Sequence, residues 1–135
     1  MWHTRAHSRS QRLTALVAAL FGLTTVAAGG RILLGLGDAG YHVVRPVLLF
    51  NTAMGVLYLV AAVLILRDLG RGRLLAGGIA ALNVVVLLTV VVRRATGGAV
   101  ASETLAAMTL RAVVWLAITA VLTVALRAPV DRPSA

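Results

Sequence analysis

Four apolar stretches, each long enough to cross a lipid bilayer, occupy most of this 135-residue chain. A hydrocarbon core about 30 Å thick needs about 20 helical residues, because each residue adds 1.5 Å to a helix. The stretches cover Leu13–Leu34, Pro46–Leu66, Leu74–Val92 and Leu105–Leu126. We therefore predict an all-α fold, namely an integral membrane four-helix transmembrane bundle with short loops.

The remaining residues leave no room for a second domain. Residues 1–12 form a basic N-terminal segment and residues 127–135 form a polar tail with two prolines. Only 13% of the residues are charged, against about 25% in soluble domains, so the chain lacks the polar surface of a soluble globule. A single membrane domain over residues 1–135 is expected.

The first apolar stretch also fits a cleaved signal peptide. A basic start precedes it, and Val26-Ala27-Ala28 has the small residues of a cleavage site. The apolar pattern resumes after Arg31, however, and the rest of the chain looks like a bundle that needs this helix. We favour a retained membrane span.

The ends of the helices carry glycine, proline and capping signals. The first helix is expected to stop at Gly35 and Gly37, and Pro46 suits the first turn of the second helix. The second helix should end near residues 67–70, with a short hairpin at residues 71–73 leading into the third. Ser102 is the expected N-cap of the fourth helix.

The arginines are divided unequally between the two ends of the predicted bundle. Four spans place both termini on one side, and that side carries Arg5, Arg9, Arg12, Arg67, Arg71, Arg73, Arg127 and Arg132. The other side carries only Arg31, Arg45, Arg93 and Arg94. The positive-inside rule therefore predicts cytoplasmic termini in a bacterial inner membrane. The use of arginine for every basic residue, without lysine, indicates a GC-rich bacterial genome.

The net charge of +9 does not indicate nucleic-acid binding, because the arginines lie at helix ends instead of forming one basic face. Membrane lipids with anionic headgroups are the expected partners, together with other membrane-protein subunits or a second copy of this chain. The absence of cysteine excludes disulfide exchange, thiolate metal sites and haem attached through Cys-x-x-Cys-His.

Small residues predict where the helices approach one another. In lipid, helices associate through close packing and buried polar contacts, because apolar side chains gain nothing by leaving lipid tails. One face of the first helix carries Ala15, Ala18, Gly22, Thr25 and Gly29, and the third helix carries Gly77, Gly78, Ala80 and Ala81. These faces predict contacts within the bundle, with a homodimer interface as the alternative.

Arg111 is the most informative residue, because a charge at membrane depth is costly and usually faces the bundle interior. Helical spacing places Thr104, Met108, Arg111, Trp115 and Thr119 on one face of the fourth helix. This stripe should point inward or towards a partner.

Other polar residues are expected near the periplasmic end of the bundle. The candidate ligand-binding set comprises Arg111, Arg31, Asn51, Tyr58, Asn83 and Trp115. A polar periplasmic cluster is predicted from Asp38, His42, Arg45 and Glu103, with Tyr58 and Asn83 lying deeper.

Two interpretations of these residues remain open. In the first, Arg111 is structural: it extends to the interface or pairs with Glu103 or Asp38, while Asn51 and Asn83 bond across helices. In the second, the arginines anchor an anionic or carbonyl-bearing ligand, for which a lipid phosphate, a quinone or a small anion would fit. Trp115 and Tyr41 also fit the role of interface anchors.

Neither catalysis nor a metal site is predicted. His42 with Asp38 and His3 with His7 have a four-residue spacing, but neither pair has further ligands nearby. No carboxylate lies at mid-membrane and no nucleophile accompanies a histidine. We predict no catalytic residue, no metal and no cofactor other than a bound quinone or lipid.

In size and number of spans the chain is similar to small multidrug exporters and to DoxX-type membrane proteins. The exporters use a carboxylate in their first helix, which this chain lacks, and no DoxX motif is matched. The sequence therefore favours a non-enzymatic accessory or structural subunit of a larger membrane complex. The alternative is a binding or transport module with a periplasmic polar pocket.

Overall fold

The computed structural model describes residues 9–41 and 43–127, and all four of the predicted helices lie within these ranges. Helix α1 covers Arg9–Leu33, α2 Arg45–Arg67, α3 Leu69–Ala95 and α4 Ser102–Arg127. Each is long and apolar enough to span a membrane. The all-helical prediction and the four candidate spans are confirmed.

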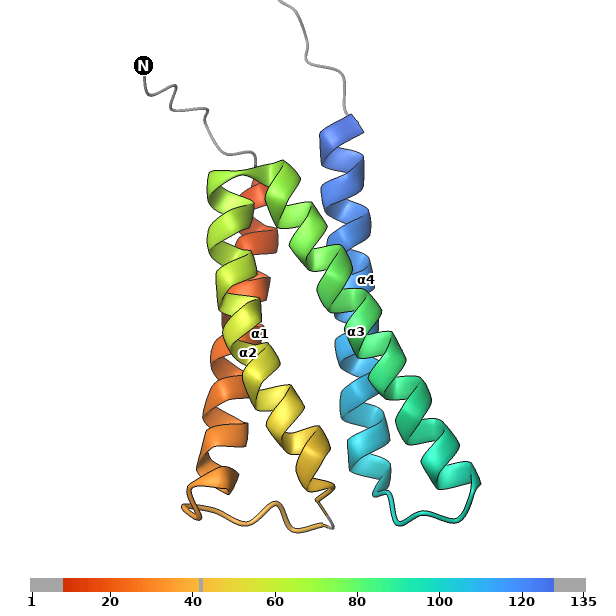
Figure 1. The fold of residues 1–135 in the computed structure, drawn as a ribbon. Coiled ribbons are helices and arrows are strands. Elements are labelled where there is room, and N and C mark those ends of the chain that lie inside the picture. Colours follow the sequence, from red (N-terminus) through yellow and green to blue (C-terminus); the bar gives the residue numbers. More distant parts are fainter. Residues whose placement is uncertain (1–8, 42, 128–135) are drawn as a thin grey trace, which may run out of the picture.

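The helices form two antiparallel pairs, α1 with α2 and α3 with α4 (Figure 1). We call the end where α1 begins, α4 ends and α2 joins α3 the turn end. The opposite end, which carries the connections at residues 34–44 and 96–101, is the loop end (Figure 1). Among neighbouring helices, α1 and α4 make the fewest contacts.

Large and small side chains are distributed as membrane packing requires. The interior contains many alanines, including Ala18, Ala61 and Ala76, while leucines and valines such as Leu20, Val63 and Val85 point outward from the helices. Close approach of backbones replaces hydrophobic burial as the organising force when the surroundings are lipid. The outward apolar belt is the surface that a bilayer would cover.

The glycine and alanine face of the first helix packs against α2, which confirms a contact within the bundle. A Cβ atom added at Gly22 would lie 2.9 Å from the carbonyl oxygen of Gly55. One added at Gly55 would lie 3.1 Å from the backbone nitrogen of Val26. Glycine is therefore required for the α1–α2 contact.

The small residues of α3 are divided between two faces. Ala80 is buried, and Gly77 faces Thr119 of α4. Gly78 and Ala81 are exposed, and a Cβ atom at Gly78 would meet nothing within 4 Å. Of the small residues predicted to form one packing face on α3, only Gly77 and Ala80 pack inside this bundle.

The turn between α2 and α3 is shorter than predicted, and the hairpin expected at residues 71–73 is wrong. Asp68 alone separates the helices, and its carboxylate accepts a hydrogen bond from the Arg71 backbone N–H at 3.1 Å. A Cβ atom at Gly72 would lie 2.8 Å from the Ile65 Cα atom. The cap and the glycine together let α3 begin at Leu69 instead of Leu74.

Helices α1 and α3 end in the same type of glycine cap at the loop end. Gly35 and Gly97 have φ angles of +72° and +86°, which side-chain-bearing residues rarely adopt. In each cap, the N–H of the residue after the glycine donates a hydrogen bond to the carbonyl five positions earlier. Leu36 N–H donates to Arg31 O, and Gly98 N–H donates to Arg93 O. This is the Schellman arrangement, and it confirms the predicted stop of the first helix at Gly35.

The other ends differ from the prediction in detail. Helix α1 begins at Arg9, so part of the expected N-terminal segment is helical. At the start of α4, the Ala101 carbonyl accepts the first helical bond, from Leu105 N–H, and the Ser102 hydroxyl bonds Glu103 instead of capping. Pro46 occupies the first turn of α2, as predicted.

Candidate functional site: a polar cavity at the loop end

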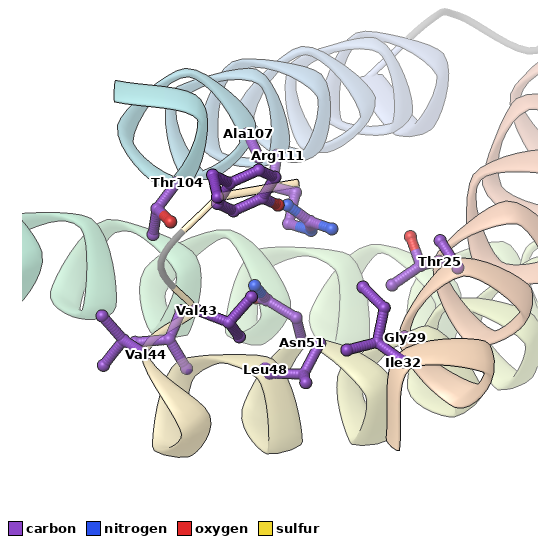
Figure 2. Close-up of a pocket in the computed structure, with 13 residues that line it drawn as sticks. Thr25, Gly29, Ile32, Val43, Val44, Leu48, Asn51, Thr104, Ala107 and Arg111 are labelled. Atoms are coloured by element: carbon purple, nitrogen blue, oxygen red, sulfur yellow. The ribbon is translucent and has the colours of Figure 1, made fainter. Parts of the chain in front are cut away.

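A cavity of about 100 Å³ lies at the loop end, bounded by α1, α2, α4 and the 34–44 connection. Most of its lining is apolar, with Ile32, Val44 and Leu48 among the contributing side chains (Figure 2). Its polar residues come from separate helices: Thr25 from α1, Asn51 from α2, and Thr104 and Arg111 from α4 (Figure 2).

Arg111 lies on the inward stripe of α4, which confirms the prediction from helical spacing. Thr104, Met108 and Trp115 on the same stripe are buried, and Arg111 itself is half-buried. Its Nε atom is fully enclosed and has no hydrogen-bond partner. A guanidinium donor enclosed without an acceptor is energetically unfavourable and points to a group that completes it.

No carboxylate neutralises Arg111 in the part of the chain that the structure describes. The ion pair there joins Arg71 to Asp68 at 3.4 Å, at the turn end. The predicted alternative pairing of Arg111 with Glu103 or Asp38 is therefore not formed. The neighbours of the guanidinium that interact with it electrostatically are the phenol groups of Tyr58 and Tyr41.

Asn51 supplies a second unpaired polar group to the same cavity. Its Oδ1 atom is enclosed and makes no hydrogen bond. The expected bond between Asn51 and a neighbouring helix is thus absent at this oxygen. A buried amide oxygen without a donor costs about 1–3 kcal/mol, so the cavity contains one unsatisfied acceptor, Asn51 Oδ1, and one unsatisfied donor, Arg111 Nε.

Two threonines in the cavity differ from the other threonines between residues 9 and 127. Elsewhere in these ranges, each threonine hydroxyl donates to a backbone carbonyl of its own helix. Thr25 and Thr104 make no such bond, although both residues are buried. Their hydroxyl groups therefore remain available to a molecule in the cavity.

Below the cavity, towards the middle of the bundle, the predicted residues Tyr58, Asn83 and Trp115 form a packed core in which each is 0% exposed. The Asn83 Nδ2 donates to the Tyr58 hydroxyl at 3.2 Å and to Ile79 O at 3.0 Å. The Tyr58 ring lies 4.7 Å from Trp115 and 5.8 Å from Phe21, measured between ring centroids. These residues support the floor of the cavity and do not line it.

Complete burial of Trp115 excludes the interface-anchor interpretation for this residue. Its indole Nε1 atom is enclosed and has no hydrogen-bond partner. Tyr41, the other proposed anchor, lines the cavity from the connection between α1 and α2 and is 39% exposed.

The polar periplasmic cluster does not assemble as one site. Asp38, Arg45, Glu103 and Arg31 are exposed and do not line the cavity. Asp38 accepts a hydrogen bond from Gly40 N–H at 3.1 Å, and Glu103 accepts one from the Ser102 hydroxyl at 3.2 Å. His42 lies outside the described residues. Of the candidate ligand-binding set, only Arg111 and Asn51 reach the cavity.

Sequence reasoning missed Thr25 as a cavity residue, because its spacing with alanine and glycine indicated only a packing face. Thr104 was predicted to lie on the inward stripe of the fourth helix, but no role was assigned to it. Tyr41 was predicted to be an anchor at the membrane–water interface. No local pattern distinguishes a threonine that bonds its own helix from one that does not.

The cavity can bind a group rich in oxygen acceptors. A guanidinium forms charge-assisted hydrogen bonds with oxyanions, while hydroxyl and carboxamide groups donate or accept. Within the described residues, no three histidine, aspartate or glutamate side chains gather in a way that would hold a metal ion.

Comparisons with known proteins give no relative from which a role can be inferred. No family model matches the chain, and neither a curated protein nor a solved structure matches it. The cavity is therefore the feature of the molecule from which a function can be inferred.

Proposed function

We propose that this chain is a four-span bacterial inner-membrane protein that binds a small ligand in the cavity at the loop end. The ligand presents oxygen acceptors, as a lipid headgroup, a quinone or a small anion does. The observation that carries this proposal is that polar groups from three helices converge on one space: Arg111 Nε and Asn51 Oδ1, which are enclosed without a hydrogen-bond partner, and the hydroxyl groups of Thr25 and Thr104. Whether the protein stores, presents or transports the ligand follows from its partners.

The distribution of arginine supports a periplasmic position for this cavity. The turn end carries Arg9, Arg12, Arg67, Arg71, Arg73 and Arg127 among the described residues. The loop end has Arg31, Arg45, Arg93 and Arg94. The positive-inside rule then places the turn end and both termini in the cytoplasm.

Topology can be tested directly because the chain has no cysteine. Single cysteines at exposed Asp38 and Ala99 of the loop end should react with a membrane-impermeant maleimide in intact cells. A cysteine at Arg71, at the turn end, should react only after the membrane is permeabilised. The opposite pattern would refute the proposed orientation.

Ligand binding is tested by native mass spectrometry of protein extracted in mild detergent. The wild-type protein should carry a bound small molecule that Arg111→Leu loses. Arg45→Leu is the matched control, because Arg45 is an exposed arginine at the same end that does not line the cavity. Equal retention of all small molecules by the two variants would refute the binding proposal.

A second candidate function is that of an accessory subunit in a larger membrane complex. It is favoured by the face of α3 around Gly78 and Ala81, which is exposed and offers close backbone approach to another helix. Substitution Gly78→Leu should then release a stoichiometric protein partner during purification, while cavity variants retain it. A wild-type protein that purifies as a monodisperse monomer would contradict this role.

A further inference from the structure

Two apolar hollows lie along the α1–α4 seam, farther towards the turn end than the polar cavity. The first hollow has a volume of about 300 Å³ and lies between Val17 of α1 and Val114, Ala117 and Val121 of α4. The second, of about 360 Å³, shares Val121 and continues past Ala120 to Val124. Both are almost entirely apolar in their lining.

On α4 the cavity and the first hollow are neighbours, although they share no lining residue. Arg111 lines the cavity, and Val114, one helical turn later, lines the first hollow. From Arg111 to Val124 the helix rises about 20 Å, at 1.5 Å per residue. Contacts between α1 and α4 are sparse, and we call the pair of hollows between these two helices the furrow.

We propose that the cavity and the furrow together bind a long-chain carboxylic acid in its ionised form. The carboxylate bonds Arg111 and the free hydroxyl groups of Thr25 and Thr104, and the alkyl chain lies in the α1–α4 furrow. This inference rests on the proposed binding function and specifies the ligand class.

Charge favours a carboxylate over a quinone. Arg111 has no carboxylate partner among the described residues, so an anionic head neutralises it, whereas a carbonyl group leaves the charge uncompensated. Shape favours one alkyl chain over two, because the cavity is small and the hollows that neighbour it on α4 form a single row, whereas the other apolar groove lies on the α1–α2 face around Leu59. A diacyl phospholipid would bring a second chain and a bulkier headgroup.

The carboxylate head group of the ligand supplies the binding free energy, and the furrow orients its alkyl chain. An alkyl chain gains nothing by moving from lipid tails to an apolar groove, for the same reason that apolar side chains do not drive helix association in membranes. Charge-assisted hydrogen bonds contribute about 1.5–3 kcal/mol. Loss of the head charge should therefore reduce affinity about 10- to 100-fold.

The test measures the occupancy of oleate, methyl oleate, decylubiquinone and a phosphatidylglycerol by native mass spectrometry of the delipidated full-length protein. Oleate should bind, and methyl oleate should bind about 10- to 100-fold more weakly because it lacks the charge. Equal binding of the acid and its methyl ester would refute the proposal that the site recognises an ionised carboxylate.

The furrow is tested by filling it. Ala117→Trp should lose most of the oleate occupancy, because the indole takes the space of the chain. Ala53→Trp is the matched control, since Ala53 is exposed on α2 and lines neither the cavity nor a hollow. Equal oleate binding by the two variants would refute the proposal that the alkyl chain lies in the furrow.

Ala120→Trp provides a second furrow variant in case Ala117→Trp does not fold. Because Ala120 lines only the hollow nearer the turn end, this variant should weaken oleate while leaving the shorter decanoate unaffected. If the variant loses both oleate and decanoate, or retains both, the proposed path of the alkyl chain along the furrow is contradicted.

These results separate the two proposals. If Arg111→Leu changes the occupancy of no probe, both the binding function and its carboxylate ligand are refuted. If Arg111→Leu removes decylubiquinone or phosphatidylglycerol and oleate does not bind, the binding function stands and the carboxylate is refuted.

Discussion

The two ends of this bundle solve the same problem of placing polar groups inside an apolar molecule in opposite ways. Towards the turn end and the centre, Asp68 caps α3 and Tyr58 bonds Asn83, with both residues of that pair fully buried, although Trp115 Nε1 in the same core has no partner. At the loop end, Arg111 and Asn51 retain enclosed atoms without partners. Under the proposed function, the paired groups stabilise the bundle and the unpaired groups at the loop end receive a ligand.

The close packing of the turn end should produce the largest stability effect. In Gly72→Ala the new methyl group would lie 2.8 Å from Ile65 Cα and 2.9 Å from Ile65 N, and such overpacking costs about 1–3 kcal/mol. In Gly78→Ala the methyl group meets nothing, so helix propensity should stabilise this control by up to about 1 kcal/mol. Reversible unfolding in mixed micelles measures both changes. Equal effects at the two positions would show that the turn end is not tightly packed.

A loop-end substitution should act through backbone conformation instead of packing. Gly97 has a φ angle of +86°, so Gly97→Ala should cost about 1–2 kcal/mol. Hydrogen exchange should increase only at the end of α3 and in the 96–101 connection. Gly37→Ala is the control, because Gly37 does not have a positive φ angle. Faster exchange throughout the bundle would mean that the loop end is not independent.

The buried Tyr58–Asn83 pair should contribute about 1 kcal/mol to stability, as hydrogen bonds between membrane helices do. Tyr58→Phe and Asn83→Ala should show a favourable coupling energy of this size in a double-mutant cycle. Thr24→Val is the control, because the exposed Thr24 hydroxyl only bonds Leu20 O of its own helix. A coupling energy near zero would contradict the contrast between paired and unpaired polar groups.

Arg111→Leu should have the smallest effect on stability in the absence of ligand, or even raise stability. No described carboxylate loses a partner when the charge is removed, and replacing an uncompensated buried charge by an apolar side chain is often neutral or stabilising. Thermal unfolding of the delipidated protein measures the change. A loss of several kcal/mol would show that Arg111 is structural.

The general architecture could be predicted from the sequence because it depends on local quantities. Stretch length and hydropathy predict four helices, Gly35 predicts a stop, and 3-4 spacing predicts that Arg111 and Trp115 share an inward face. Each of these inferences uses residues within a few helical turns of one another. The start of α3 was missed because Gly70 and Gly72 suggested a turn, whereas the Asp68 cap and the contact with Ile65 hold both in a helix.

The candidate site could be predicted only in part. Arg111 and Asn51 were found because a polar residue in an apolar stretch is conspicuous, and both line the cavity. Thr25 was missed as a cavity residue, and Arg31, which was included, does not line the cavity. Whether Thr25 or Arg31 lines a cavity depends on which helix ends lie apart from one another. The sequence of a single helix does not specify the positions of the other helices.

The order of residues by itself determined that the chain makes four long apolar helices and that Arg111 faces inward, because helix formation and amphipathicity depend on neighbours in the chain. Only the tertiary structure decided that Thr25, Asn51, Thr104 and Arg111 meet in one cavity and that α1 and α4 leave a furrow beside it. The physical reason is that helix contacts in lipid are set by backbone approach at small residues such as Gly22 and Gly55. Where that approach is lacking, the helices separate and leave room for a ligand.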